Sequence, residues 1–315
     1  MLTTFMLAMA LIVAPATAPA EADTPERLRA LVERLSTEFA DRDPTHPKVY
    51  AAAADMLAEQ LRDAGVRTVE RQTLSLLVDD AIVACDNLIA DIPGRGEDAG
   101  VLIVGAHYDT IPGTPGANDN ASGVAGIIEL ARRLHDVEPR HTIRLVLWAN
   151  EEPPYFQTPA MGSVEHAQSL GDEKVIGAIS LDMIGYFDDA PGSQEIPEGL
   201  VLPGVDMASL GVADFLVVLG EPGSAGLVET FVEAWDAPVR LVPAVLPKEV
   251  GIAGLSDHWA YWQEGYPAVQ ITDTSFLRYD HYHQPTDTPE KLDYDRMAAG
   301  IAGIESAVRV LAGVE

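Results

Sequence analysis

The chain has 315 residues, of which 47% are hydrophobic, so it can bury the core of one large domain or of two small ones. Its net charge of −29 arises from 49 acidic and 20 basic residues, and a surface with that charge repels phosphate backbones, so we expect no nucleic-acid partner. The single cysteine, Cys85, excludes an intrachain disulfide.

The N-terminus has the pattern of an export signal. Residues 5–13 form an apolar run too short to span a bilayer, and overlapping Ala-x-Ala cleavage sites follow between Ala16 and Ala22. No Lys or Arg precedes the run, so only the amino terminus supplies positive charge there. A buried N-terminal helix is the alternative, but two prolines interrupt it. We predict a signal peptide at 1–22, a single domain at 23–315, and a secreted or periplasmic protein without a membrane span.

Apolar residues at helical spacing predict two helices near the start of that domain. One begins at Thr24-Pro25, and the other runs from about residue 48 to 64 and is ended by Gly65. Two extended runs, at 66–77 and 82–92, should pair as a hairpin.

Strands and helices then alternate along the chain. Apolar runs predict strands at 101–106, 143–149, 175–183, 215–219, 239–246 and 267–272, and helical periodicity predicts helices at 121–136, 224–236, 256–264 and 294–311. This alternation predicts a three-layer α/β/α sandwich with a mixed, mostly parallel central sheet. Residues 187–203 are acidic, rich in Gly and Pro and without periodicity, so we expect a surface excursion near the mouth of a site.

The first chemically capable residues follow the strand at 101–106. His107 and Asp109 are two apart, so on an extended chain their side chains point the same way. A carboxylate beside an imidazole fixes the ring tautomer and makes the other nitrogen a better ligand. We therefore interpret His107 as a metal ligand and Asp109 as its orienting partner. A loop rich in Gly and Pro then brings Asp119 back toward His107.

Three further groups lie at or beyond strand ends, where open α/β sheets place their sites. Glu151 and Glu152 follow the strand at 143–149, and because neighbours on an extended chain point apart, one can bind a metal while the other stays free as a base. Asp182 interrupts an apolar strand, and a buried carboxylate is costly unless a cation neutralises it. Beyond the last strand, His283 is our chosen ligand and Asp287 is expected to fix its loop.

The remaining histidines are weaker candidates. His258 is ambiguous, and we expect surface positions for His46, His135, His141 and His166.

The donors add up to two imidazoles and three carboxylates, from His107, Asp119, Glu152, Asp182 and His283. If Asp119 bridges, each of two metals receives one imidazole, one terminal carboxylate and one bridging oxygen. Positions for water or substrate remain, so the pattern favours an open, catalytic pair of Zn²⁺ ions rather than a closed structural site.

These motifs resemble the five signature blocks of the co-catalytic di-zinc exopeptidases, peptidase family twenty-eight. The blocks cover roughly residues 84 to 293 and read, in order, His107-x-Asp109, Asp119, Asn150-Glu151-Glu152, Asp182-Met-Ile-Gly185 and Tyr282-His283-x-Pro-x-Asp-Thr288. The resemblance implies a zinc-aminopeptidase-like fold and two zinc ions. One zinc would lie between His107 and Asp182 and the other between Glu152 and His283, with Asp119 bridging them.

The same resemblance implies the catalytic roles. Glu151 is the expected general base, and Asp109 orients His107. Tyr282 resembles a tyrosine that polarises the scissile carbonyl in some members, whereas others have an aliphatic residue there. In such a site, Glu151 takes a proton from a water whose pKa the cations lower, and the hydroxide attacks a peptide carbonyl. Glu151 then returns the proton to the leaving amine.

Peptides are the expected substrates, and we favour cleavage from the amino end. The α-amine is cationic near neutral pH and the site is rich in carboxylates. A carboxypeptidase would need a fixed cation to hold the terminal carboxylate, and only Arg278 lies close in sequence to His283.

A glutaminyl-cyclase-like acyltransferase with one zinc is a further alternative. An inactive binding module is the least favoured, because all ligands and Glu151 are retained. Pocket residues are expected within 187–225 and 250–280, with Phe276 and Trp259 as candidates.

Overall fold

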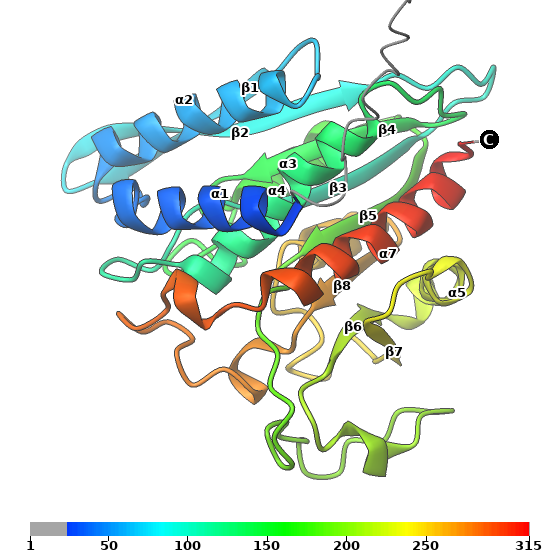
Figure 1. The fold of residues 1–315 in the computed structure, drawn as a ribbon. Coiled ribbons are helices and arrows are strands. Elements are labelled where there is room, and N and C mark those ends of the chain that lie inside the picture. The colour runs from blue at the N-terminus through cyan, green and yellow to red at the C-terminus, as the bar shows by residue number, and fades with distance from the viewer. Residues whose placement is uncertain (1–23, 315) are drawn as a thin grey trace, which may run out of the picture.

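The structure, a computed structural model, describes residues 24–314. The predicted signal peptide at residues 1–22 lies outside the described residues. Across the described chain, one mixed sheet of eight strands has helices on both faces, as predicted (Figure 1). The strands are β1 (Glu70–Val78), β2 (Ala81–Ile92), β3 (Val101–His107), β4 (Thr142–Trp148), β5 (Val175–Leu181), β6 (Phe215–Gly220), β7 (Arg240–Val245) and β8 (Ala268–Thr272).

The strand order is β1-β2-β4-β3-β5-β8-β6-β7. Strands β4, β3, β5 and β8 form a parallel centre, and β7 is parallel to β6. The pairings β1 with β2, β2 with β4, and β6 with β8 are antiparallel. The carboxyl ends of the four central strands therefore lie at one edge of the sheet.

The helices form two layers. One layer consists of α1 (Thr24–Glu38), α2 (Pro47–Asp63), α3 (Gly123–Leu134), α5 (Ala225–Ala234) and α7 (Tyr294–Ala312), and the other of α4 (Gly162–Ser169) and α6 (His258–Gln263). Short turns of helix also occur at Ala117–Ser122, Met207–Leu210, Pro222–Ser224, Ser275–Leu277 and Pro289–Lys291.

Side-chain alternation explains why the strands need both layers. On β3, Leu102, Val104 and Ala106 pack into the core beneath α3 and α7. Val101 and Ile103 point the other way, into the core that contains α4 and α6. Because both faces are buried, the strand is a continuous apolar run rather than an alternating one.

The predicted elements are confirmed, with ends that shift by a few residues, and two of these shifts have clear local causes. Strand β1 begins at Glu70 rather than at residue 66, because Gly65 has a φ of +104° and the Val66 N–H donates to Leu61 O at the end of α2. Helix α3 begins at Gly123 rather than at residue 121, because the backbone before it leaves helical geometry at Asp119.

The expected excursion folds back over the ends of β6 and β8, at the bottom of Figure 1. Its Asp188 forms a β-bridge with Ala213, and the Glu195 N–H donates to Leu277 O. Arg296 of α7 also donates to Asp189 over 2.6 Å. The segment is therefore held as part of the wall beside the central strand ends.

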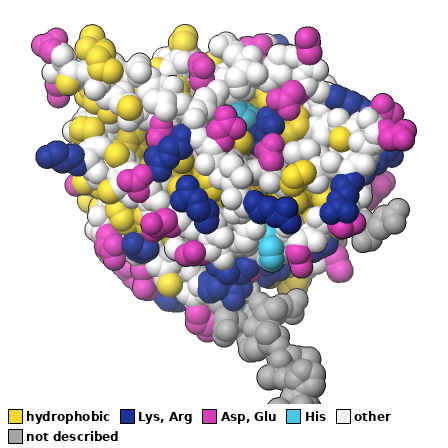
Figure 2. All heavy atoms as spheres, turned by 90° about the horizontal axis from the view of Figure 1, so that it is seen from above, with side chains coloured by type: hydrophobic (Ala, Val, Ile, Leu, Met, Phe, Trp, Pro, Cys, Tyr) yellow, Lys and Arg dark blue, Asp and Glu magenta, His cyan; other side chains and the backbone are white. Residues whose placement is uncertain are grey.

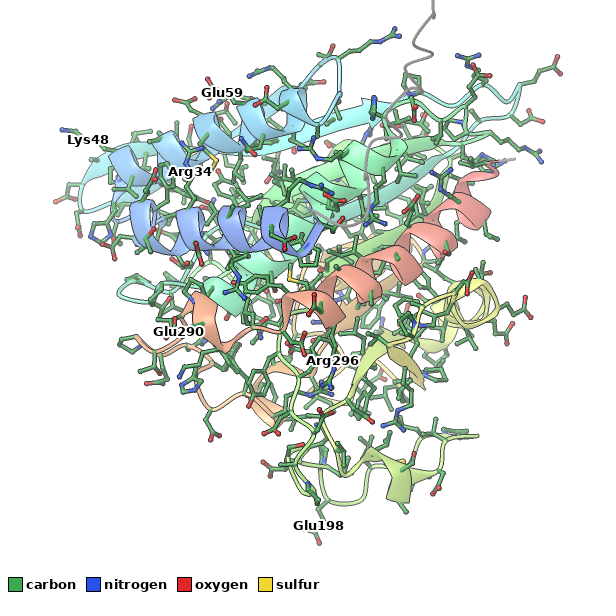
Figure 3. The ribbon with its side chains drawn as sticks, in the orientation of Figure 1. Arg34, Lys48, Glu59, Glu198, Glu290 and Arg296 are labelled. Atoms are coloured by element: carbon green, nitrogen blue, oxygen red, sulfur yellow. The ribbon has the colours of Figure 1, made fainter. Side chains whose placement is uncertain are left out.

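Many charged side chains point outward, as Glu59 and Glu198 do in Figure 3. The face in Figure 2 carries Lys and Arg among Asp and Glu, so the negative charge is not uniform over the surface. Among the described residues, no helix has the length and apolar character needed to cross a membrane.

Candidate metal centre

The structure brings the five predicted ligands together at the carboxyl edge of the central strands. His107 ends β3, Glu152 follows β4 and Asp182 follows β5, whereas Asp119 and His283 come from loops. They form two groups of donor atoms that share Asp119, one with His107 and Asp182 and one with Glu152 and His283. Within each group, the donor atoms all lie within 4.8 Å of one another.

The distances between donor atoms fit tetrahedral ions. In the first group, His107 Nε2 lies 3.4 Å from Asp119 Oδ1 and 3.6 Å from Asp182 Oδ1. In the second, His283 Nε2 lies 3.1 Å from Asp119 Oδ2 and 3.2 Å from Glu152 Oε2. Ligands bonded to one tetrahedral zinc at about 2.0–2.1 Å lie about 3.3 Å apart. The two oxygens of Asp119 thus face two different imidazoles, as a bridging carboxylate requires.

Orphaned polar atoms support the same fit. Asp119 Oδ2 and Glu152 Oε1 are buried and have no hydrogen-bond partner within residues 24–314. A buried acceptor without a partner destabilises the fold unless another group, such as a cation, satisfies it. The donor set of carboxylate and imidazole, without thiolate, suits zinc in an open site.

The charges of the centre shift its pKa values. Burial opposes protonation of His107, but the carboxylates of Glu151 and Asp109 raise its pKa well above the usual range. Burial likewise opposes protonation of His283, but Asp119 and Glu152 raise its pKa to about 10. When no metal is bound, both shifts favour the charged imidazolium form, in which each ring carries a proton on both nitrogens. Metal binding must displace one proton from each ring, so metal affinity falls as the pH is lowered.

Asp109 connects the first ligand to the glutamate pair. Its Oδ1 lies 3.5 Å from His107 Nδ1 and accepts the Glu151 N–H over 3.0 Å. Its Oδ2 accepts the Glu152 N–H over 3.0 Å. One buried carboxylate thus fixes the backbone that carries the two glutamates and lies beside the ring of His107, whose Nδ1 has no hydrogen-bond partner within residues 24–314.

The glutamate pair is held from the other side by Asn150, whose φ is +58°. The Asn150 N–H donates to the Tyr50 hydroxyl over 3.0 Å, and that hydroxyl donates to Asn150 Oδ1 over 3.2 Å. Glu151 belongs to neither donor group, yet its Oε2 lies 3.9 Å from His107 Nε2. Burial, together with the charge of Glu152, raises the pKa of Glu151 well above its usual range. Its environment therefore favours the uptake of a proton.

The loop that carries Asp119 is fixed on both sides of that residue. Asp287 accepts the N–H groups of Asn118 and Asp119 over 2.8 and 3.1 Å, so it fixes this loop as well as its own. Asn120 Nδ2 donates to Leu181 O over 2.8 Å, at the end of β5. The Asp119–Asn120 peptide bond is cis. These contacts tie Asp119 to the strand that leads to Asp182.

Arg42 was not singled out in the sequence, where it is one charged residue in a polar turn. It is fully buried, and its guanidinium donates to carbonyl oxygens that include those of Leu35, Tyr108 and Gly116. Gly116 has a φ of +61°, and a Cβ there would collide with Thr110. Arg42 thus joins the end of α1 to both ends of the loop between Asp109 and Asp119.

Asp273 was also missed, although it directly follows an apolar strand like the predicted ligands. It is buried, accepts from Asn118 Nδ2 over 2.8 Å and from the Tyr186 N–H over 2.9 Å, and lies outside both donor groups. Its position at a strand end was the signal that could have identified it as a residue that supports the Asp119 loop.

Two histidines remain structural. His258 is fully buried and its Nε2–H donates to Ala253 O over 2.7 Å, so it is not one of the donors. The surface position expected for His166 is wrong: it is buried and shares a hydrogen bond of 2.7 Å with the Tyr261 hydroxyl. Helix α4 packs on α6, and this contact covers His166.

A cavity opens directly beside the two donor groups. It is lined at one end by Asp119, Glu151, Glu152, Asp182, Tyr282 and His283. The ring of Tyr282 stacks on that of His283, with centroids 3.7 Å apart. Phe276 lines the cavity as predicted, but Trp259 does not and packs against Gly254 instead. The remaining lining comes from both of the predicted segments, 187–225 and 250–280, and from neighbouring strands.

Comparisons with known proteins identify relatives of this chain. A sequence pattern described as Peptidase family M28 matches residues 87–306. The uncharacterized protein YfbL of Escherichia coli strain K12 is 35% identical over 291 residues, which are 89% of this chain and 86% of YfbL. The probable leucine aminopeptidase 1 of Trichophyton verrucosum is 28% identical and the match covers 86% of this chain and 73% of that protein.

Solved structures share the fold. A zinc aminopeptidase from Bacillus subtilis matches with a TM-score of 0.69 and 15% identity, over 94% of this chain and 96% of that one. A glutaminyl cyclase from Porphyromonas gingivalis matches with a TM-score of 0.64 and 21% identity, over 91% and 97%. At these identities the likeness concerns the fold.

We expect Asp109→Asn to lower zinc affinity by about 10–100-fold, because a neutral amide orients His107 less firmly and no longer makes its other ring nitrogen a stronger ligand. The measurement is competition with a chelator for zinc. Glu129→Gln is a matched control, since Glu129 is also a buried carboxylate, at 4% exposure, and pairs with Arg27 and Arg133 away from the donors. Equal zinc affinity in the two variants would make Asp109 a mere loop residue.

Proposed function

The chain belongs to peptidase family M28, and we propose that it removes N-terminal residues from peptides with two zinc ions held by the five residues described above. As a member of this family it is a zinc-dependent exopeptidase, and relatives such as the probable leucine aminopeptidase 1 support the class of metallo-aminopeptidase. The observation that carries the two-ion proposal is the carboxylate of Asp119. Its two oxygens lie 3.4 and 3.1 Å from the Nε2 atoms of His107 and His283.

Glu151 is the proposed general base. When bound, the ions would polarise the scissile carbonyl and lower the pKa of a water between them. Glu151 lines the cavity beside the donor groups, so it can take a proton from that water and return it to the leaving amine. Its backbone is fixed by Asp109, which keeps the carboxylate in one place through both transfers.

Tyr282 is proposed to contact the substrate carbonyl. It lines the cavity, and its hydroxyl has no hydrogen-bond partner in the described part of the chain. Burial, together with the charge of Asp119, raises the pKa of Tyr282, so the hydroxyl keeps its proton and can donate it. The stacking on His283 sets the direction in which the ring points.

Electrostatics favours the amino end of the peptide. No Lys or Arg is among the described residues that line the cavity, whereas Glu151, Glu152 and Asp182 are. Arg278, the one cation considered for a carboxypeptidase, is buried and donates to Gln194 and Phe215 O over 2.7 and 2.9 Å. A cationic α-amine therefore meets carboxylates here, and a terminal carboxylate meets no Lys or Arg side chain among the described lining residues.

A glutaminyl-cyclase-like reaction remains the second candidate, because a cyclase shares the fold. It is less favoured because both donor groups are complete, so the site offers ligands for two ions rather than one. Metal analysis of the purified protein separates the two candidates.

Glu151→Gln should lower kcat by about 10²–10⁴-fold and leave both metals bound, because it removes a base and not a ligand. Glu152→Gln should lose metal, because it removes a donor to the ion shared with His283. The measurements are kcat and metal content for each variant. Equal metal loss in the two variants would contradict the assignment of Glu151 as the base and Glu152 as a metal ligand.

N-acetylation of a test peptide should abolish cleavage, and C-terminal amidation should leave it intact, because the α-amine is the group that the carboxylates bind. Product analysis by mass spectrometry reads the outcome. Glu151→Gln serves as the control for contaminating peptidases. The opposite pattern would overturn cleavage at the amino end while leaving the di-zinc mechanism in place.

Export is proposed from the apolar run at residues 5–13. N-terminal sequencing of protein from the periplasm or culture fluid should find a new terminus between Ala16 and residue 23. A charge within the run, as in Leu11→Arg, should keep the protein inside the cell. An intact Met1 on an intracellular wild-type product contradicts this localisation.

A further inference from the structure

The cavity beside the donor groups continues into a deep apolar pocket. It encloses about 960 Å³ of space not filled by atoms, part of it open to solvent. Its floor is the face of β6, β7 and β8 that also packs toward α4 and α6, and its cover comes from residues 194–210 and 246–255. Most of the lining is aliphatic, including Leu202, Val217, Leu219 and Val242.

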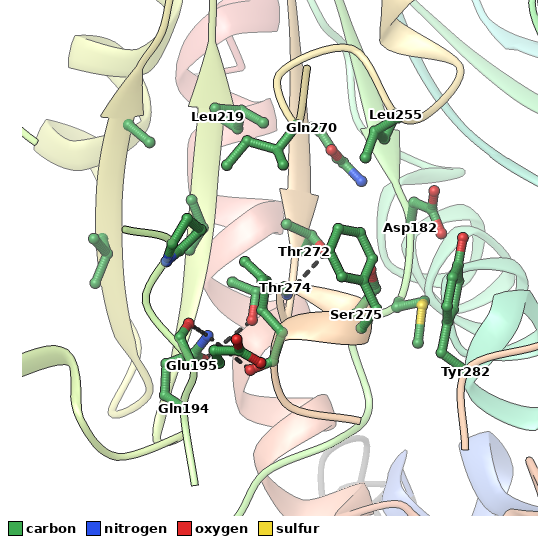
Figure 4. A pocket seen from close by; sticks show the side chains of 18 of the residues that line it. Asp182, Gln194, Glu195, Leu219, Leu255, Gln270, Thr272, Thr274, Ser275 and Tyr282 are labelled. Carbon is green, nitrogen blue, oxygen red and sulfur yellow. Dashed lines mark hydrogen bonds between the residues drawn. The ribbon is translucent and has the colours of Figure 1, made fainter. Parts of the chain in front are cut away.

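Gln270 is one of two polar residues, with Thr272, on the floor of this pocket. It lies on β8 opposite Leu219 of β6 and Ser180 of β5, and its side chain lines the pocket between Leu219 and Leu255 in Figure 4. The residue is 7% exposed and lines the pocket, and its side-chain amide has no hydrogen-bond partner among residues 24–314.

Two other polar side chains of the lining already have hydrogen-bond partners within the chain. Thr272 Oγ1 accepts the Thr274 N–H over 3.0 Å. The Gln194 oxygen accepts from Arg278 and Thr274 over 2.7 and 3.1 Å. The amide of Gln270 is thus a donor and acceptor in a largely apolar pocket, and leaving such a group unpaired when the pocket fills is unfavourable.

Gln270 lies at a depth that a substrate side chain can reach. The Asp182 N–H donates to Ile271 O, which places the ligand Asp182 beside the end of β8. Gln270 and Thr272 are two residues apart on β8, so they point to the same face and lie about 6.6 Å apart along the strand. The paired strands β8 and β5 run about 4.8 Å apart. A residue whose carbonyl lies at the donor groups can therefore extend a long side chain toward the Gln270 amide.

We propose that Gln270 is the specificity-determining residue of this pocket and selects N-terminal residues whose side chain is apolar along its length and ends in a hydrogen-bonding group, tyrosine above all. This inference rests on the proposed aminopeptidase function. The aliphatic walls take the ring, and the amide of Gln270 bonds the phenolic hydroxyl. Phenylalanine fills the same space but leaves the amide unpaired, so the site discriminates against it.

The test compares kcat/KM for Tyr, Phe and Leu 4-nitroanilides with the wild-type protein and with Gln270→Met, which keeps the length but removes the amide. The wild type should prefer Tyr to Phe by about 10-fold or more, and Gln270→Met should bring the ratio close to 1. Gln263→Met is the matched control, because it makes the same change at an exposed residue that does not line the pocket, and it should keep the wild-type ratio.

A binding measurement separates this inference from the proposed function. The dissociation constants of L-tyrosine and L-phenylalanine hydroxamates for the zinc-loaded protein should differ in the same direction and lose that difference in Gln270→Met. This readout holds even if no anilide is cleaved, an outcome that would count against the aminopeptidase function alone. Equal constants for the two hydroxamates, or a Tyr preference that Gln270→Met retains, would overturn the role of Gln270.

Discussion

The carboxylate of Asp119, placed between two imidazoles, is the interaction on which the rest of the centre depends. Each of its oxygens faces a different histidine, and one of those histidines ends β3 while the other lies in a loop beyond β8. The loop that carries Asp119 therefore has to reach the middle of the strand edge and stay there. The backbone N–H groups of Asn118 and Asp119 and the side-chain amides of Asn118 and Asn120 all donate hydrogen bonds that serve that purpose.

Buried negative charge is the main electrostatic constraint of this region. Asp109, Asp119, Glu151, Glu152 and Asp182 are all buried around the two donor groups, and such crowding is unfavourable without cations. Burial and the charge of Asp119 raise the pKa of Glu152 to about 8, and protons on the imidazoles balance part of the charge when no metal is bound. Metal ions replace those protons, so the same crowding that destabilises the empty centre favours metal binding.

Arg42 supplies a permanent cation beneath this charge. Burial lowers its pKa to about 10, while the nearby carboxylates oppose that shift, so it stays charged at neutral pH. It contacts carbonyl oxygens rather than the carboxylates themselves, which leaves the ligand oxygens free for metal. The charged groups and the apolar pocket occupy different parts of the sheet. The charged residues lie at its carboxyl edge, and the adjoining face of β6, β7 and β8 forms the floor of the pocket.

The sequence by itself determined the order of the elements, the fold class and the set of residues that meet at the strand edge. It could do so because each of His107, Glu152 and Asp182 stands at the end of an apolar run, and parallel strands bring such ends to one edge. Only the tertiary structure decided the roles of Arg42, His166 and Gln270. Those roles depend on strand register, on helix packing and on contacts between residues far apart in the chain, none of which has a local pattern. In the sequence, Gln270 is only a polar residue within an apolar strand. The strand register places it opposite Leu219, in the lining of the pocket, where its amide has no hydrogen-bond partner among the described residues.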